Sequence, residues 1–540
     1  MIRRILTVLA AATLLAACTS HAAGRPAATS PAITPGAPTT LRVLAGSELA
    51  DMRPILDEAA KATGVTVKMD FTGSLEGAET VATGKADGKY DAVWFSSNRY
   101  LETIPEAQRR LATATRIMGS PVVLGLRAAA AQRLGWTGRK VTWSDIAAAA
   151  SHGDFTFAMT DPTASNTGFS ALVAVASALD GSGRALDAAA IERVARPLTG
   201  FFSAQRMTAG SSAWLTDAFV RRVTGADTGP PLDGLINYEG SLVELNRSGR
   251  LGEPLTLIYP SDGVVSADYP LTLLASASTT ARDAHERLTD YLRLDAVQRK
   301  IGAVTVRRPA LPGVPTPAGL PAAPVELPFP ETRVSIDALL TAYLDRLRRP
   351  SRTVYVLDVS GSMRGARIAA LKSALAGLTG VNQSLTGSYC RFRSREEVIL
   401  LPFSDAPRQP ASFTIDAARA QPSRDVLRGA IERLQVGGNT AVYDSLTAAY
   451  RRLDAAADKD RFVSIVLMTD GENNRGRDLA AFKRFVSARP GAAAVPVFPI
   501  LFGDAAEAPM RAIAAATDGE TWDARNGDLT GAFCEVRGYQ

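Results

Sequence analysis

The sequence predicts an α/β protein with a two-lobed N-terminal domain followed by a doubly wound C-terminal domain. Three observations lead to this prediction. The chain has 540 residues, which is too many for one hydrophobic core. In both halves, short apolar runs of strand length alternate with amphipathic segments of helix length, as in α/β folds. A Pro-rich stretch, residues 307–330, separates the two halves as an interdomain linker would.

The first 18 residues have the order of a cleaved export signal. Basic residues precede an apolar run that ends in Leu15-Ala16-Ala17-Cys18. This ending resembles a bacterial lipobox, which implies that Cys18 is acylated and that a lipid anchors the protein at the extracytoplasmic face of the bacterial membrane. An ordinary secretory peptide with an incidental Cys is the alternative. Residues 19–40, mostly Ala, Pro, Thr and Ser, are expected to form a disordered tether.

Residues 41–308 contain enough strand runs for two lobes rather than one. Helical segments fall between most of these runs, so each lobe is expected to be an α/β unit. The runs are residues 41–45, 65–71, 90–95, 121–127, 155–160, 234–239, 255–260 and 270–275.

Residues 309–350 are predicted to be a Pro-rich linker with one short helix. The segment SIDALLTAYLDRLRR, residues 335–349, has apolar residues at helical spacing. This helix is expected to pack on one of the two domains.

Residues 351–540 are predicted to form the doubly wound domain. Its buried strands are residues 355–358, 398–403, 462–470 and 495–503, and the helices between them have a 3.6-residue apolar period. Residues 388–404, SYCRFRSREEVILLPFS, are expected to form a hairpin that adds one antiparallel edge strand.

Oxygen donors follow the ends of three strands or helices in this second half. Asp358, Ser360 and Ser362 stand at alternate positions after a buried strand, at the edge of the sheet where doubly wound folds bind ligands. Thr440 lies in the loop GGNTAVYD, and Asp470 lies in MTDGENN. Carboxylate and hydroxyl oxygens suit Mg²⁺, with Mn²⁺ or Ca²⁺ as alternatives. An Asp and Ser turn that caps the next helix without metal is the other interpretation.

Together the three loops resemble the metal-ion-dependent adhesion site of a von Willebrand factor type A (VWA) domain, over residues 351–540. The resemblance implies that Asp358, Ser360, Ser362, Thr440 and Asp470 hold the metal, some of them through water. Asp444 is a weaker candidate that caps a helix or orients Thr440. In this family, a carboxylate from a partner protein fills the open coordination position of the ion.

Small polar loops follow the strands of the first half. DPTASNTGFSALV, residues 161–173, places hydroxyl and amide side chains before a helix, where helix-start amides favour an anion or a polar solute. With the other loops, residues 41–308 resemble a two-lobed extracellular solute-binding protein of the periplasmic type. The resemblance implies seven ligand contacts: Ser47, Ser74, Ser97, Ser165, Asn166, Thr167 and Tyr238. Glu239 would repel an oxyanion if its side chain pointed inward.

The cysteines, the charge balance and the missing catalytic motifs limit the classes of function that the sequence allows. Cys390 and Cys534 are the cysteines that remain after Cys18, and in an exported chain they are a candidate disulfide, with two buried thiols as the alternative. The 60 Lys and Arg residues barely exceed the 54 Asp and Glu residues and form no basic patch, which argues against a nucleic-acid partner. Three histidines and the absence of a nucleophile-elbow or phosphate-loop motif argue against an enzyme.

The sequence therefore predicts a lipid-anchored surface protein that binds an unknown protein partner through a divalent metal. The two-lobed domain would then be a sensor or a second binding module. The alternative is the receptor of an importer of the ABC type for an oxyanion or another small polar solute.

Overall fold

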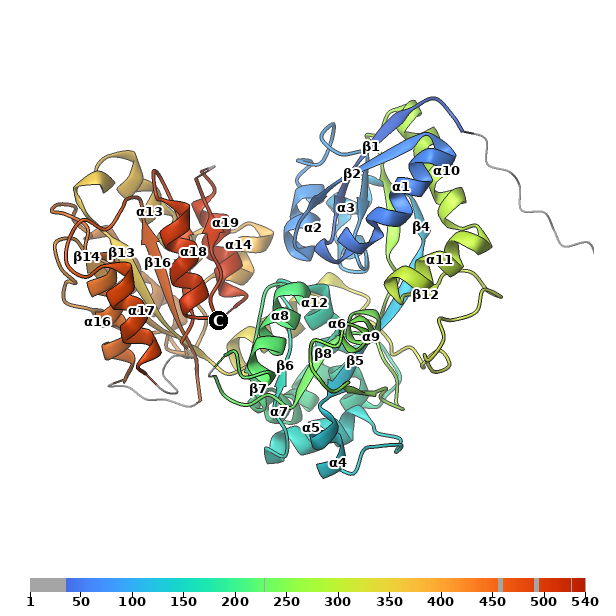
Figure 1. Ribbon diagram of the computed structural model, residues 1–540, viewed down its shortest axis with the longest axis horizontal. Coiled ribbons are helices and arrows are strands. Elements are labelled where there is room, and N and C mark those ends of the chain that lie inside the picture. Colours follow the sequence, from blue (N-terminus) through green and yellow to red (C-terminus); the bar gives the residue numbers. More distant parts are fainter. Residues whose placement is uncertain (1–34, 228, 455–459, 490–494, 526, 540) are drawn as a thin grey trace, which may run out of the picture.

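The computed structural model describes residues 35–539, apart from residues 228, 455–459, 490–494 and 526. These residues form three bodies, two lobes from the first half of the chain and one domain from the second half (Figure 1). The predicted export signal, the predicted lipidation site Cys18 and residues 19–34 of the predicted tether lie outside the described residues. No helix in the described part of the chain is long and apolar enough to cross a bilayer.

The first lobe is built on a five-stranded sheet with the order β2-β1-β3-β11-β4. The first strand begins at Thr39, two residues before the predicted run, because its backbone pairs in parallel with β2 from Val65 onward. The elements of this lobe are β1 (Thr39–Ala45), α1 (Arg53–Thr63), β2 (Val65–Phe71), α2 (Ser74–Ala82), β3 (Ala92–Trp94), α3 (Pro105–Gln108), β4 (Leu111–Arg116), β11 (Pro270–Leu274), α10 (Thr279–Leu292) and α11 (Asp295–Thr305).

The second lobe is built around β5, whose nine residues are all buried. Its sheet has the order β10-β5-β8-β6-β7, and β9 and β12 also pair with β5. The elements are β5 (Met118–Leu126), α4 (Ala128–Arg133), α5 (Trp143–His152), β6 (Phe157–Ala158), α6 (Asn166–Asp180), α7 (Ala188–Ser203), β7 (Gln205–Met207), α8 (Ser212–Val223), β8 (Gly234–Tyr238), α9 (Glu239–Arg247), β9 (Thr256–Ile258), β10 (Ser266–Ala267) and β12 (Arg308–Pro309).

The chain passes between the lobes in extended segments. β4 of the first lobe leads directly into β5 of the second, and β10 of the second lobe leads back into β11 of the first. The lobes are therefore joined by short β connections, and a cleft can form between them.

The linker packs against the N-terminal half. The predicted helix is α12 (Arg333–Ala342), which continues as one π-helical turn, Tyr343–Leu347. Its apolar residues, among them Leu339 and Tyr343, belong to the same buried cluster as the cores of the two lobes. The linker helix therefore forms part of the first domain, although it lies next to the second domain in the sequence.

The C-terminal domain has a six-stranded sheet with the order β15-β14-β13-β16-β17-β18. Neighbouring strands are parallel except at the edge, where β15 pairs antiparallel with β14. The elements are β13 (Ser351–Asp358), α13 (Ala366–Ala376), α14 (Leu385–Cys390), β14 (Glu397–Phe403), β15 (Ala411–Thr414), α15 (Ala420–Glu432), α16 (Val442–Asp454), β16 (Phe462–Thr469), α17 (Leu479–Ser487), β17 (Val497–Leu501), α18 (Glu507–Ala516), β18 (Trp522–Asp523) and α19 (Leu529–Arg537).

Helices cover both faces of this sheet. Along β13, Tyr355 and Leu357 enter the buried cluster on one face, whereas Val354 and Val356 enter the cluster on the other. Side chains of a strand alternate between faces, so a strand buried on both faces must be apolar throughout. This explains the continuous apolar run that ends at Asp358.

The predicted hairpin of residues 388–404 is wrong. Residues 385–390 form the short helix α14, which the Ser384 side chain caps by accepting a hydrogen bond from the Gly387 amide. The antiparallel edge strand is β15, which follows β14 along the chain. The prediction paired β14 with the segment that precedes it, whereas in the structure β14 pairs with the segment that follows it.

Candidate metal centre and interdomain cleft

Asp358 occupies the carboxyl end of the central strand β13. Parallel pairing with β16 places it beside Thr469, whose hydroxyl donates to Asp358 Oδ2 at 2.6 Å. The Ser360 amide donates to Asp358 Oδ1 at 2.8 Å. Asp358 is fully buried, so these two donors fix its carboxylate at the sheet edge.

The two serines and the second aspartate form a continuous chain of contacts. Ser360 Oγ lies 3.0 Å from Ser362 Oγ, and the Ser362 hydroxyl donates to Asp470 Oδ1 at 2.8 Å. Asp470 directly follows β16, 108 residues after Ser362. Asp358, Ser360, Ser362 and Asp470 therefore meet at one edge of the sheet.

Backbone contacts bring the Thr440 loop to the same edge. The Gly361 amide donates to the Gly438 carbonyl at 2.9 Å, which joins this loop to the serine turn. The Asn474 amide donates to the Thr440 carbonyl at 3.0 Å, and the Thr440 amide donates to Asn474 Oδ1 at 2.8 Å. Thr440 is buried between the loops that carry the other four predicted ligands.

Asp444 has a different role from the five predicted ligands. Its carboxylate forms an ion pair with Arg477 and accepts a hydrogen bond from the Arg477 amide at 3.3 Å. It therefore holds the loop after Asp470 in place.

Two carboxylates with different surroundings set the electrostatics of this edge, Asp358 and Asp470. Burial raises the pKa of Asp358, and the negative charge of nearby Asp470 contributes in the same direction. Arg367, a residue that the sequence analysis did not single out, donates to Asp470 Oδ2 at 2.7 Å, and its other end pairs with the exposed Asp504 at 2.5 Å.

The donor set fits a hard divalent cation. Two carboxylates and three hydroxyls are oxygen ligands of the kind that Mg²⁺, Mn²⁺ and Ca²⁺ take. The described residues contain no cluster of three or more His, Cys, Asp or Glu, so hydroxyl groups must complete any shell at this edge. Ser362 is exposed while the other four are buried, and the site therefore opens to solvent on one side.

A second candidate site is a cavity of about 740 Å³ between the two lobes and the C-terminal domain. Five of the seven predicted contacts line it. The side-chain amide of Asn166 (Nδ2) donates to the Tyr238 hydroxyl at 3.1 Å, and Thr167 Oγ1 lies 2.7 Å from Ser212 Oγ. The lining residues from the prediction are Ser47, Ser165, Asn166, Thr167 and Tyr238.

The other two predicted contacts stand apart. Ser97 does not line the main cavity, and its hydroxyl accepts a hydrogen bond from the Arg99 amide at 3.3 Å. The neighbouring Ser96 lines the cavity instead. Ser74 is the first residue of α2, and its side chain is outside the described part of the chain.

Glu48 lines the cleft, whereas Glu239 does not. Glu239 is fully buried and makes a two-pronged ion pair with Arg308, with both oxygens at 2.7 Å, so it is not the inward charge that was considered. Glu48 lines the cavity, and burial raises its pKa. Burial, followed by the charge of Glu48, also raises the pKa of Tyr238 to about 12. The sequence placed Glu48 next to a predicted contact, Ser47, but gave no sign of its direction.

These geometries define a class of protein, one that joins a two-lobed cleft to a doubly wound domain with an oxygen-rich sheet edge. Comparison with protein families identifies the two parts. Residues 41–303 match the family of bacterial extracellular solute-binding proteins, and residues 353–472 match the von Willebrand factor type A domain. The chain therefore carries a solute-binding domain followed by a VWA domain, and both predicted resemblances are confirmed.

Solved structures are similar to a little over half of the chain. The sulfate-binding protein SubI from Mycobacterium tuberculosis H37Rv is 20% identical, with a TM-score of 0.41 over 55% of this chain and 98% of that one. Iron-bound HitA from Pseudomonas aeruginosa is 16% identical, with a TM-score of 0.42 over 56% and 95%. The Trichodesmium protein IdiA (FutA), in complex with iron and citrate, is 13% identical, with a TM-score of 0.42 over 56% and 98%. A comparison with curated proteins gave no match.

Proposed function

We propose that this protein is a lipid-anchored, extracytoplasmic binding protein that holds a partner protein through a divalent cation in its VWA domain. The solute-binding domain would act as a sensor or as a second binding module. The observation that carries the proposal is the contact chain from Ser360 through Ser362 to Asp470, beside Asp358 at the same sheet edge.

The residues of this edge have separate tasks in the proposed site. Asp358 and Asp470 supply negative charge, and Ser360, Ser362 and Thr440 supply neutral oxygens. When bound, the ion would supply a positive centre for a carboxylate of the partner. Because the set contains only two carboxylates, a divalent ion there keeps enough positive character to attract a third.

The surface around the site supports access by a partner. Ser362 and the loop residues Arg364, Glu472 and Asn474 are exposed, and none of them lines the interdomain cavity. A protein can therefore approach this edge while the VWA domain remains in contact with the two lobes.

The competing function is an importer receptor for an oxyanion. The cleft between the lobes favours solute binding, but Glu48 faces into it, and a carboxylate in that position repels an anion. We therefore place partner binding first and treat the solute as a signal or a second ligand.

The metal site is tested by thermal unfolding of the wild type and of Asp358→Ala, each with EDTA and then with Mg²⁺ or Mn²⁺. A ligand that binds only the folded state stabilises it by about 2.7 kcal/mol at one hundred times its Kd. We expect the added ion to stabilise the folded wild type in this way and to leave the stability of Asp358→Ala unchanged. Asp425→Ala is the matched control, because Asp425 is an exposed aspartate on α15 of the same domain. An identical transition in every sample would reject the site.

The partner is tested with the same variants by chemical cross-linking on intact cells. Proteins that cross-link to the VWA domain in the wild type and in Asp425→Ala should disappear with EDTA and in Asp358→Ala. Cross-links that persist without the ion would assign partner binding to another surface.

A further inference from the structure

The VWA domain contacts both lobes of the solute-binding domain. On the first lobe, α14 packs against α2 (Figure 1), and Glu79 accepts hydrogen bonds from the Thr386 amide at 2.8 Å and from its hydroxyl at 2.6 Å. On the second lobe, the Tyr539 ring packs edge-on against Trp214, with 4.9 Å between ring centroids. The VWA domain therefore contacts both sides of the cleft.

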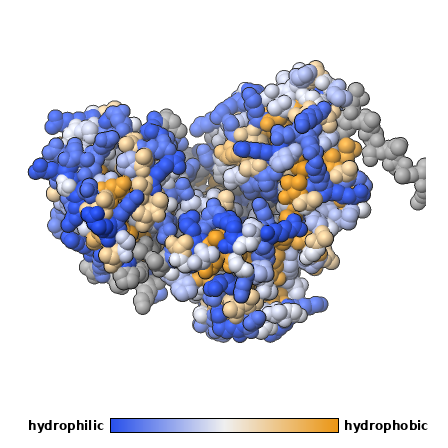
Figure 2. All heavy atoms as spheres, viewed as in Figure 1, coloured by the Kyte–Doolittle hydropathy of each residue, from blue (hydrophilic) through white to orange (hydrophobic). Residues whose placement is uncertain are grey.

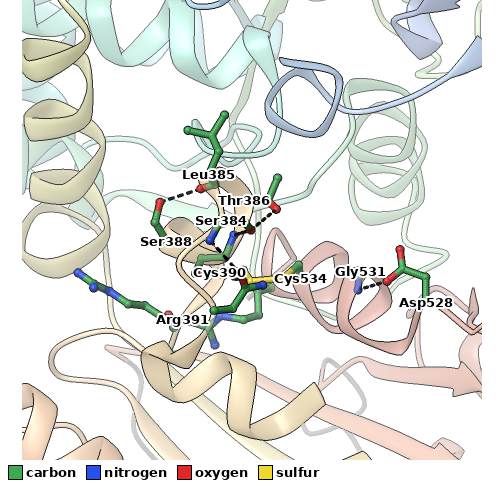
Figure 3. Close-up of a disulfide and its surroundings, with 12 residues drawn as sticks. Ser384, Leu385, Thr386, Ser388, Cys390, Arg391, Asp528, Gly531 and Cys534 are labelled. Carbon is green, nitrogen blue, oxygen red and sulfur yellow. Dashed lines mark hydrogen bonds between the residues drawn. A yellow bond between two sulfur atoms is a disulfide. The ribbon is translucent and has the colours of Figure 1, made fainter. Parts of the chain in front are cut away.

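The two contacting parts of the VWA domain are linked to each other. A disulfide joins Cys390, at the end of α14, to Cys534 in α19 (Figure 3). The helix α19 leads directly to Tyr539, which also packs on Trp522 of the VWA core. A displacement of α14 from the first lobe must therefore move the segment that touches the second lobe.

Buried charges tie this face to the cleft loop of the second lobe. Arg348 donates to Glu396 at 2.6 Å and lies 3.6 Å from Asp161, and all three side chains are at most 2% exposed. Arg537 of α19 also pairs with Glu396 at 2.8 Å. Asp161 in turn accepts the Thr163 amide at 2.7 Å, within the loop that lines the cavity. Removing one member of such a buried network would leave an unpaired buried charge, so these residues depend on the docked arrangement for their partners.

The cavity itself has a third wall. Besides residues of both lobes, it is lined by VWA residues that include Trp522, Asp528, Glu535 and Tyr539. Figure 2 shows a notch in the molecular surface between the VWA body and the upper lobe. A solute in the cleft would therefore touch the VWA domain as well as the lobes.

The charge of the cavity identifies the class of solute. Four lining carboxylates, Glu48, Glu76, Glu79 and Glu535, form no salt bridge among the described residues, whereas Arg348 and Arg537 are committed to Glu396. Enclosure by protein raises the pKa of Glu535 to about 7, and the charge of Glu76 on the facing lobe adds to this shift. Lys85 is the remaining cation of the lining. The excess of negative charge attracts cations and repels anions.

The walls and the size fit an organic cation. The lining includes the rings of Phe71, Phe95, Tyr238, Tyr389, Trp522 and Tyr539. Aromatic faces bind organic ammonium groups, and a volume of about 740 Å³ is in the range of small-molecule sites, far larger than a single metal ion.

We propose that the C-terminal segment of the VWA domain, residues 529–539, is the third wall of the solute site, so that an organic cation in the cleft and docking of the VWA domain on the two lobes stabilise each other. This inference rests on the solute-binding half of the proposed function and is independent of the metal site. Because coupling between two binding events is reciprocal, a solute that touches α19 must strengthen the docked arrangement.

The test is calorimetric titration with spermidine, with sulfate as the anionic probe, on the full chain in an Asp358→Ala background that removes the proposed metal site. We expect spermidine to bind and sulfate not to bind. Glu535→Gln, a change in the VWA domain, should weaken spermidine binding about three- to tenfold, as should Glu48→Gln in the first lobe. Glu432→Gln, on the exposed end of α15 outside the cavity, is the matched control and should bind like the parent.

Docking of the VWA domain on the two lobes is measured separately, by hydrogen exchange of α14 and α19. Spermidine should slow exchange in both helices, and Tyr539→Ala should speed it and weaken spermidine binding. Spermidine affinity unchanged by Glu535→Gln and Tyr539→Ala would overturn the third wall, even if Glu48→Gln weakened it. Sulfate binding in place of spermidine would overturn the cationic class while leaving solute binding intact, and binding of neither probe would overturn the site as proposed.

Discussion

Arg367 is the residue whose substitution is most informative at the metal edge. Its guanidinium already neutralises part of the Asp470 charge, at 2.7 Å, and therefore competes with a divalent ion for the same carboxylate. We expect Arg367→Gln to increase Mn²⁺ affinity about threefold or more, because one competing positive charge is removed. Mn²⁺ titration followed by electron paramagnetic resonance measures this directly.

Arg364 provides the control for this substitution. It is exposed in the same turn, and Arg364→Gln removes an equal charge without a contact to Asp470. An equal gain in both variants would indicate a long-range charge effect. Weaker Mn²⁺ binding in Arg367→Gln would mean that the arginine orients Asp470 and does not compete with the ion.

The predictability of single residues depended on the distance between partners along the chain. Asp358, Ser360 and Ser362 could be recognised because alternate positions on one short turn bring their oxygens together. Arg367 and Asp470 are 103 residues apart in the sequence, so no local sequence pattern indicates their contact. Ser97 was chosen over Ser96 because a pair of adjacent serines does not reveal which one faces the cleft. Likewise, the sequence does not reveal whether the Glu48 side chain points into the cleft.

The elements were predicted well where a strand is buried on both faces and poorly at the edges. The strands β13, β14, β16 and β17 could be read from continuous apolar runs. In contrast, β15 has mostly exposed residues and no apolar run, and α14 is too short to show a helical period. Both are set by tertiary contacts, β15 by pairing with β14 and α14 by its packing on α2.

The disulfide between α14 and α19 gives a prediction at the scale of elements. It closes a separation of 144 residues, and a crosslink over such a distance restricts the unfolded chain. We expect the double variant Cys390→Ala, Cys534→Ala to lower the free energy of unfolding of the VWA domain by about 3 kcal/mol. Urea unfolding, followed by tryptophan fluorescence with and without reductant, measures the change.

Reductant supplies the control for this experiment. It should destabilise the wild type by a similar amount and leave the double variant unchanged. If the wild type were equally stable in both conditions, the crosslink would contribute nothing to the fold, and its place at the docking face would be its main consequence.

At the scale of the molecule, the contact between the domains should depend on pH. Asp518 of the VWA domain lies against the second lobe, 3.6 Å from Arg221. Burial raises its pKa from 3.8 to about 6, and the charge of Asp227 contributes, while Arg221 and Arg222 oppose the shift. Separation of the domains exposes Asp518 and returns its pKa toward 3.8.

The sign of the effect follows from this raised pKa. The docked state binds the proton more tightly, so the contribution of Asp518 to docking is fully present below pH 3.8 and is lost as the pH rises through about 6. Glu535, whose pKa is about 7 at the cavity, acts in the same direction, so the stability of the docked state continues to fall at higher pH. We therefore expect the VWA domain to dock more firmly at pH 5 than at pH 8.

Small-angle X-ray scattering and hydrogen exchange of α14 and α19 at the two pH values measure this difference. Asp518→Asn should reduce the pH dependence, and adding Glu535→Gln should nearly abolish it, because neither amide titrates. Asp425→Asn, an exposed change on α15, should keep the dependence of the wild type. A domain arrangement that loosens toward acid pH in the wild type would contradict the prediction, since protonation removes the cost of burying these charged carboxyls, which outweighs the lost attraction of Asp518 to Arg221 and Arg222.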